Sequence, residues 1–325
     1  MATSTTAVEF ELESACQRFG EDYVANRLRL QAEHVASQLG LYSRPFHIEN
    51  LPWFARIAAG LFRVTGLYER GHRNFMDVRI RHNTVVLPSL PAAFDGYTIC
   101  HLTDLHLDLD PSLTSVIAER LDGIEYDLCV LTGDYRNGTH GPYDVVLEEL
   151  AALSPHLASP VFATLGNHDF LEMAGGLEAL GISVLVNERR EIERDDEQIL
   201  LAGVDDPNIY RTDDVARALN GADPSLTKIL LSHSCCIYPT AHEAGVDLVL
   251  CGHTHGGQIC LPGGAAVLSE ELTPRWMWNG PWEYKGMKGY TSPGTGACAV
   301  PLRLFCPPEI TLHHLQGAAP IDRAS

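Results

Sequence analysis

The stretch Leu250-Cys251-Gly252-His253-Thr254-His255-Gly256-Gly257-Gln258 places two histidines directly after a short apolar run. Histidines two positions apart point to opposite faces of a continuing strand, but the flanking glycines free the backbone to turn. Such a turn can bring both imidazoles toward neighbouring ions. The stretch therefore predicts a metal site at the end of a strand, provided that further ligands converge on it.

Four segments upstream have the same form, a short apolar run that ends in a residue type able to bind a metal. They are Thr103-Asp104-Leu105-His106, Thr132-Gly133-Asp134, Leu165-Gly166-Asn167-His168-Asp169 and Leu231-Ser232-His233. Taken singly, each has an ordinary structural explanation, as a capping aspartate, a left-handed asparagine or a buried histidine. Their recurrence in order along one chain favours a shared metal centre.

Apolar runs and helical patterns alternate through the middle of the chain. We predict strands over 77–87, 97–102, 127–131, 161–165, 199–204, 229–231 and 247–251, and helices over 111–121, 143–153, 171–180 and 213–219. This alternation is typical of an α/β fold, in which the loops after the strands converge on one crevice. We therefore expect the candidate ligands to meet at the carboxyl ends of the strands.

The first part of the chain has a different character. A helical pattern runs from Leu12 to Leu39, with Gly40 placed to end it. We expect residues 1–73 to form a helical extension, residues 74–316 the catalytic domain and residues 317–325 a flexible tail.

Residues 51–70 of this extension combine an apolar stripe with regularly spaced basic residues. Apolar side chains recur at helical spacing at Phe54, Ile57, Leu61, Val64 and Tyr68, and Arg56, Arg63 and Arg70 are seven apart. The pattern fits an amphipathic helix on an anionic membrane surface. It fits equally a helix that packs on the catalytic domain or on a second copy in a homo-oligomer.

Composition limits the classes of partner and compartment. The formal net charge of −19 over 325 residues disfavours binding to a nucleic acid polymer and suits a small or lipid-linked phosphate ester. The nine cysteines are irregularly spaced and indicate reduced thiols. Residues 1–10 lack the pattern of a secretory signal, and no apolar run is long enough to span a bilayer. We expect a cytoplasmic protein that can be peripheral on the inner membrane.

Together, the motifs resemble those of the calcineurin-like metallophosphoesterase superfamily over residues 75–315. The resemblance implies a four-layer α-β-β-α sandwich and two divalent ions, for which the donor types suit Mn, Fe or Zn. It assigns Asp104, His106 and His255 to one ion and Asn167, His233 and His253 to the other, with Asp134 as the bridge. It also implies attack on phosphorus by a metal-bridging hydroxide, with His168, next to Asn167, as the catalytic histidine that protonates the leaving group.

One motif departs from the pattern of the family's phosphatases. Asn137 stands where they have an acid, and Gly138 stands where they have an arginine that holds the additional oxygen of a phosphomonoester. The departure favours a phosphodiester or pyrophosphate as substrate. We expect Asn137 to orient His168 through its amide, Arg136 to be the substitute clamp and His140 to lie near the substrate.

The carboxyl-terminal part of the chain resembles a bacterial subgroup that includes membrane-linked phosphoesterases and enzymes similar to UDP-2,3-diacylglucosamine pyrophosphatase. Its markers are Gly257–Pro262 and the segment 294–310. The aromatic residues of 276–290 could cover the site or close the edge of a second sheet. A lipid-linked nucleotide pyrophosphatase, a soluble cyclic-nucleotide or general phosphodiesterase, and a metal-stabilised binding scaffold are the three functions to distinguish.

Overall fold

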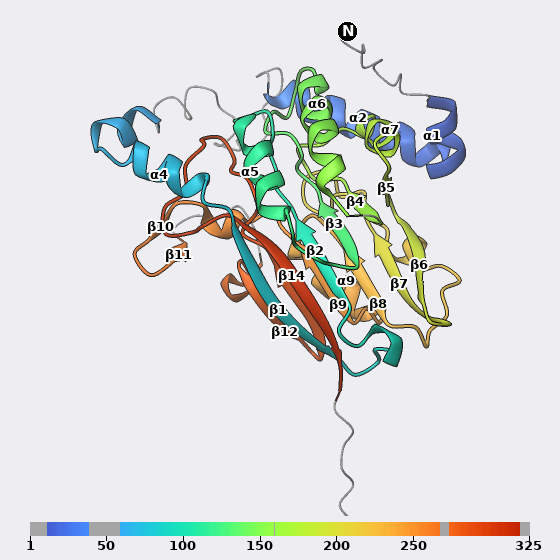
Figure 1. Cartoon of the computed structure of the whole chain (residues 1–325). Coiled ribbons are helices and arrows are strands. Elements are labelled where there is room, and N and C mark those ends of the chain that lie inside the picture. Colours follow the sequence, from blue (N-terminus) through green and yellow to red (C-terminus); the bar gives the residue numbers. More distant parts are fainter. Residues whose placement is uncertain (1–11, 39–58, 159, 267–272, 319–325) are drawn as a thin grey trace, which may run out of the picture.

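The computed structural model describes residues 12–38, 59–158, 160–266 and 273–318. Two six-stranded sheets dominate it, with strand orders β1-β14-β2-β3-β4-β5 and β12-β13-β9-β8-β7-β6 (Figure 1). The strands are β1 (Arg79–Leu87), β2 (Thr98–Leu102), β3 (Leu128–Thr132), β4 (Val161–Thr164), β5 (Ile182–Val184), β6 (Glu188–Arg194), β7 (Glu197–Gly203), β8 (Lys228–Leu231), β9 (Leu248–Cys251), β12 (Gly280–Tyr284), β13 (Met287–Thr291) and β14 (Glu309–Gly317). A small hairpin pairs β10 (Cys260–Leu261) with β11 (Ala265–Ala266).

Helices cover the outer faces of the two sheets. The helices are α1 (Leu12–Phe19), α2 (Glu21–Gln38), α4 (Tyr68–Phe75), α5 (Ser112–Leu121), α6 (Asp144–Leu153), α7 (Met173–Ala179), α8 (Val215–Ala218) and α9 (Tyr238–Glu243). The apolar residues of α1, α2, α5, α6 and α7 pack on the first sheet, and those of α8 and α9 pack on the second. The layer order is helix, sheet, sheet, helix.

A shared core joins the two sheets face to face. It contains Ile99 and Val130 from the first sheet and Leu201, Ile229 and Leu250 from the second, all fully buried. The central strands β2, β3, β4, β8 and β9 are therefore apolar on both faces, as expected for parallel strands covered on each side. The predicted four-layer α-β-β-α sandwich is confirmed.

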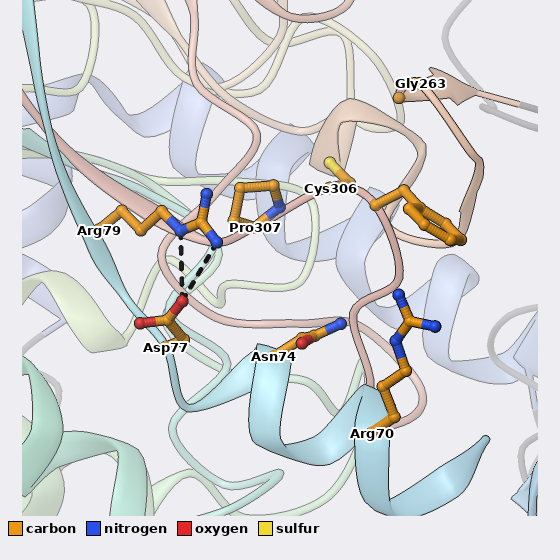
Figure 2. A pocket seen from close by; sticks show the side chains of 9 residues that line it. Arg70, Asn74, Asp77, Arg79, Gly263, Cys306 and Pro307 are labelled. Atoms are coloured by element: carbon orange, nitrogen blue, oxygen red, sulfur yellow. Dashed lines mark hydrogen bonds and ion pairs between the residues drawn. The ribbon is translucent and has the colours of Figure 1, made fainter. Parts of the chain in front are cut away.

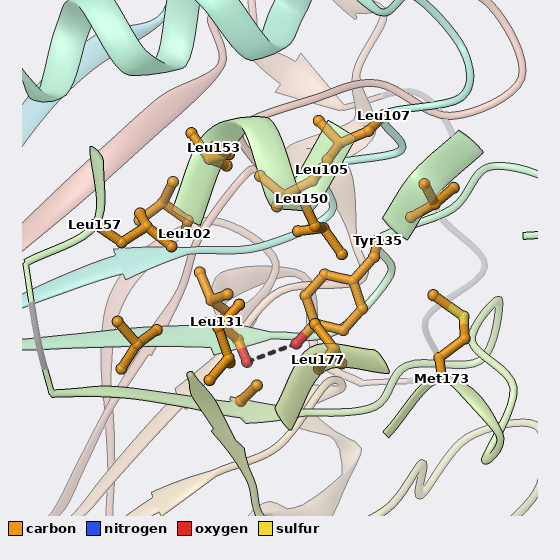
Figure 3. Packing of buried hydrophobic residues seen from close by; sticks show 14 of the residues in the cluster. Leu102, Leu105, Leu107, Leu131, Tyr135, Leu150, Leu153, Leu157, Met173 and Leu177 are labelled. Atoms are coloured by element: carbon orange, nitrogen blue, oxygen red, sulfur yellow. Dashed lines mark hydrogen bonds between the residues drawn. The ribbon is translucent and has the colours of Figure 1, made fainter. Parts of the chain in front are cut away.

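Tyr135 fixes the loop after β3 to the outer core. Its hydroxyl donates to the carbonyls of Leu131 at 3.2 Å and Thr164 at 2.7 Å, and its ring lies among leucines such as Leu105 and Leu177 (Figure 3). The buried hydroxyl is satisfied without a side-chain partner. The anchor follows Asp134 directly and so limits the movement of that aspartate.

The amino-terminal helices pack on the catalytic domain. The single helix predicted over 12–39 is interrupted at Gly20, whose φ of +92° suits glycine far better than other residues. In α2, the buried Arg27 pairs with Asp205 at 2.8 Å, donates to the carbonyl of Asp169 at 3.0 Å and stacks on Tyr210. The extension thus contacts the Asn167-His168-Asp169 motif through the carbonyl of Asp169.

The sequence patterns do not predict β5, β6, β12, β13 or β14, and of these β13 and β14 lie inside their sheets rather than at an edge. β6 is highly charged, and β12 and β13 belong to the aromatic segment whose position was left open. Trp282 and Tyr290 are buried in the cores of the second sheet, so these two aromatics close its edge. In the described part of the chain, no helix is long and apolar enough to cross a membrane.

Removal of Arg27 tests whether the extension is part of the folded domain. Arg27→Ala leaves the buried Asp205 without its charged partner, and we expect the free energy of unfolding to fall by about 3–5 kcal/mol in urea titrations. The control Arg29→Ala lies on the exposed face of the same helix, paired with Glu33. It should change stability by about 0.5 kcal/mol or less. Equal effects for the two variants would show that the extension does not stabilise the domain.

Candidate metal centre

All seven predicted ligands lie at one edge of the sandwich. Asp104 and His106 follow β2, Asp134 follows β3 and Asn167 follows β4, all in the first sheet. From the second sheet, His233 follows β8, and His253 and His255 follow β9. Because these five strands run with their carboxyl ends toward the same edge, the two sheets bring their ligands together at one site.

Asp134 occupies the centre of this group. Its Oδ2 lies 3.1 Å from Nε2 of His233, 3.8 Å from Nε2 of His168 and 3.9 Å from Nε2 of His106. Its Oδ1 accepts the main-chain N–H of His168 at 2.9 Å. One carboxylate therefore faces rings from both sheets, which is the position needed to bridge two ions.

The ligands assigned to the first ion lie on one side of Asp134. Nε2 of His106 is 3.1 Å from Nε2 of His255, and His255 Nε2 is 3.3 Å from Oδ1 of Asp104. His106 Nδ1 donates to the carbonyl of Arg136 at 2.8 Å, so its Nε2 carries a lone pair on the side of His255 and Asp134. Lone pairs from an imidazole and a carboxylate converge here, as a cation site requires.

The residues assigned to the second ion lie on the other side. Asp134, His233 and His253 offer ligand atoms that all lie within 4.8 Å of one another. Oδ1 of Asn167 is buried without a hydrogen-bond partner. A buried amide oxygen without a partner is costly, and a divalent cation is a partner that would satisfy it. The donor set thus fits a metal ion on this side as well.

The backbone at the site is strained in a consistent way. Five of the candidate ligands have positive φ, namely Asp104 at +52°, His106 at +44°, Asp134 at +56°, His253 at +70° and His255 at +49°. Such angles are uncommon outside glycine and persist only where surrounding contacts enforce them. Main-chain bonds from Asp104 N to Gly133 O and from His106 N to Asp134 O provide such contacts. The strain supports a functional role for these loops.

Burial and charge shift the acidities in the centre. Burial raises the pKa of Asp104 and brings that of Asp169 to about 6. Burial also opposes the charge of Asp134, but the facing rings of His233 and His168 hold its pKa well below the usual range. Burial lowers the pKa of His106 to about 4. An ionised Asp134 beside a neutral imidazole is a suitable environment for a divalent cation.

Residues for which the sequence predicted no role hold the ligands in place. Asp169 accepts main-chain N–H groups from Asp134 at 2.7 Å and Gly166 at 2.8 Å. Asn208 Nδ2 lies 2.6 Å from Nε2 of His253, and the buried Arg303 donates to the carbonyl of His255 at 3.1 Å. Asn208 comes shortly after β7, so the rule that polar residues follow strands would have found it. Arg303 gives no such signal.

The three residues predicted to lie near the substrate differ in burial and in their contacts. Asn137 does orient His168, but His168 Nδ1 donates to its main-chain carbonyl at 2.7 Å, so the expected use of the amide is wrong. Arg136 is 1% exposed as a residue, and its guanidinium donates to the carbonyls of His140 and Gly141 and stacks on Phe170. These contacts hold the loop over residues 136–141, and the role of Arg136 as a clamp remains a prediction. His140 is exposed, and its contact with substrate remains a prediction.

A pocket of about 410 Å³ lies next to the loop that carries His255. Arg70 and Asn74 of α4, Arg79 of β1, and Phe305 and Cys306 are among its lining residues (Figure 2). Its lining contains none of the seven predicted ligands. The sulfur of Cys306 contacts the carbonyl of His255 at 3.3 Å, so the pocket is adjacent to the metal centre but separate from it.

A sandwich with a buried aspartate between histidines of two sheets defines a metallophosphoesterase domain. Residues 97–257 match the model of the calcineurin-like phosphoesterase family. The chain belongs to this family of phosphoric ester hydrolases, whose members use divalent metal ions.

Relatives with the same domain occur in animals and bacteria. The chain is 30% identical to a transmembrane protein with metallophosphoesterase domain from Danio rerio, with 70% of this chain and 55% of that protein covered. It is 29% identical to an uncharacterized metallophosphoesterase from Aquifex aeolicus, with 74% and 92% covered. It is also 29% identical to phosphodiesterase YaeI from Escherichia coli, with 73% and 87% covered. The chain thus spans about half of the animal relative and most of the bacterial ones.

Gly166 offers a test of how tightly Asp134 is held. A Cβ at this position would lie 2.2 Å from Oδ1 of Asp134, so Gly166→Ala must displace the carboxylate. We expect metal affinity to fall by roughly 10–100-fold or more in calorimetric titration, the range seen when ligand support is lost. The control Gly60→Ala, where a Cβ meets nothing within 4 Å, should bind metal as the wild type does. Unchanged affinity in Gly166→Ala would contradict the central place of Asp134.

Proposed function

We propose that the chain is a dinuclear metal phosphodiesterase or pyrophosphohydrolase. The observation that carries the proposal is the carboxylate of Asp134, which lies between ligand groups from both sheets. Asp104, His106 and His255 would hold one ion, and Asn167, His233 and His253 the other, with Asp134 shared. When bound, the two ions would activate a water molecule for attack on phosphorus and neutralise the charge that develops.

His168 is suited to act on the leaving group. Its Nδ1–H donates to the carbonyl of Asn137, which fixes the ring and directs Nε2 toward Asp134. With Nδ1 protonated, Nε2 can give a proton only from the imidazolium form. His168 would therefore protonate the departing oxygen as a general acid.

The surroundings favour a diester or pyrophosphate over a monoester. A monoester carries an additional charged oxygen, which phosphatases of the family bind with an arginine that is replaced here by Gly138. In the described part of the chain, Arg136 and Arg303 contact ligand residues, and both guanidinium groups are buried. Each donates to main-chain carbonyls of the surrounding loops. The similarity to a protein named phosphodiesterase in Escherichia coli supports the same choice.

Hydrolysis assays test the mechanism and the substrate class together. With Mn²⁺ added to metal-stripped protein, we expect faster turnover of bis-p-nitrophenyl phosphate than of p-nitrophenyl phosphate. His168→Ala should lower kcat by roughly 10²–10⁴-fold but keep its metal content, because it removes only the acid. His233→Ala should lose metal, and the exposed control His156→Ala should behave as the wild type. Preference for the monoester would contradict the argument from Gly138, and loss of metal in His168→Ala would make that residue a ligand.

Within this class of substrates, we propose a lipid-linked one, because an exposed apolar surface of the chain favours it. Leu61 and Val64, in the helical turn over residues 59–64, are 61% and 87% exposed. They do not pack on the catalytic domain, and Arg63 and Arg70 lie close by in the chain. Exposed apolar side chains beside arginines suit an anionic membrane surface. The rest of the predicted segment, residues 51–58, lies outside the described residues.

Sedimentation with vesicles tests this contact. We expect binding to vesicles rich in anionic lipid, weakened roughly 100-fold or more by Leu61→Ser with Val64→Ser, because each side chain contributes about 1.5 kcal/mol or more when buried. The control Val145→Ser changes a valine of α6 that is 51% exposed. It should not affect binding. Unchanged binding in the double variant would reject the surface, and a change in oligomeric state instead would assign it to a second copy of the chain.

A further inference from the structure

Cys298 lies at the metal centre, although no motif of the sequence points to it. It belongs to the connection between β13 and β14, after the last predicted ligand. Its sulfur and the ligand nitrogens of His106 and His255 all lie within 4.8 Å of one another. His106 comes from the first sheet and His255 from the second, so the thiol closes a group of three potential ligands around the first ion's position.

Hydrogen bonds from two site motifs hold the backbone of this cysteine. The main-chain N–H of Cys298 donates to Oε1 of Gln258 at 2.8 Å, and Nε2 of Gln258 donates to the carbonyls of Cys298 at 2.9 Å and Val300 at 3.2 Å. Oδ1 of Asn137 accepts the N–H of Ala299 at 2.8 Å. Gln258 follows the His253–His255 motif, and Asn137 follows Asp134. The same loops that carry ligands therefore position Cys298.

The loop is also strained and closely packed at this point. Ala299 has a φ of +62°, an angle that an alanine adopts only when its surroundings enforce it. Gly296 donates its N–H to the carbonyl of Asp104 at 2.9 Å, and a Cβ on it would lie 2.2 Å from the carbonyl oxygen of Leu105. The position of the thiol is thus set by a backbone that is fixed on both sides of it.

We propose that Cys298 supplies a thiolate ligand to the metal ion held by His106 and His255. This inference rests on the proposed function, because it requires an ion at that position. Binding replaces the S–H bond with a sulfur–metal bond and releases the proton to solvent, without a change in oxidation state. A thiolate beside two imidazoles favours Zn²⁺, Co²⁺ or Fe²⁺ over Mn²⁺ and Mg²⁺. Cys298 would therefore select the ion of the first site.

Cobalt substitution tests the assignment directly. We expect the Co²⁺-loaded wild type to show a near-ultraviolet thiolate-to-cobalt charge-transfer absorption, which Cys298→Ser lacks. Cys298→Asp offers a carboxylate in place of sulfur and should retain cobalt without this absorption. The control Cys16→Ser changes a partly buried cysteine of α1, which shares no cluster with the metal-site histidines. It should keep the full absorption.

Metal selectivity gives a second measurement that does not depend on turnover. In competition titrations, Cys298→Ser should bind Zn²⁺ roughly 10–100-fold more weakly and change little toward Mn²⁺. Gln258→Ala keeps the thiol but releases its loop, so the charge-transfer absorption should weaken. These shifts separate a ligand from a packing residue.

The outcomes distinguish this inference from the proposed function. Bound cobalt with no thiolate absorption, or an absorption that persists in Cys298→Ser, would overturn the role of Cys298 and leave the dinuclear centre intact. A wild type that binds no cobalt, zinc or manganese would overturn both. Loss of the absorption in Cys298→Ser and Cys298→Asp, with cobalt retained in the second variant, would establish the ligand.

Discussion

The fold is arranged around one buried carboxylate, that of Asp134. A charged group removed from water is unstable unless opposite charges or donors surround it. Here the rings of His106, His168 and His233 face its oxygen, and a main-chain N–H binds the other. These partners come from both sheets, so the sheets must be packed in one particular alignment. The face-to-face packing of the two sheets and the geometry of the centre therefore depend on the same alignment of the sheets.

Support for this carboxylate extends well beyond the ligands. Asp169 binds the main-chain N–H groups of Asp134 and Gly166, and its own carbonyl accepts from Arg27 of α2. Arg27 also pairs with Asp205, whose neighbour Asp206 accepts the N–H of Asn208 at 3.1 Å. The amino-terminal extension is thereby connected to the residues that orient His253. The extension therefore stabilises the centre through Asp169 and Asp205, and this role requires no contact with substrate.

The segment after β13 has a corresponding role on the other side. Arg303 fixes the carbonyl of His255, while Gln258 and Asn137 fix the strained backbone around Cys298. Asn137 thus performs two tasks, since its carbonyl orients His168 and its side chain holds the neighbouring loop. An acid at this position would lack the amide but could still accept from Ala299. The change to asparagine removes a negative charge from a region that already contains several buried carboxylates.

The sequence by itself determined the ligand types, their order and the strands that carry them, β2, β3, β4, β8 and β9. Each candidate ligand follows an apolar run, and parallel strands bring such positions to one edge whatever the loops do in detail. The tertiary structure alone decided the charged edge strand β6, the inward direction of Arg136 and the places of Arg303 and Cys298. These features depend on contacts between residues far apart in the chain, and no local periodicity encodes them. A side chain's type predicts what it can bind, but only the packing of the two sheets determines what it meets.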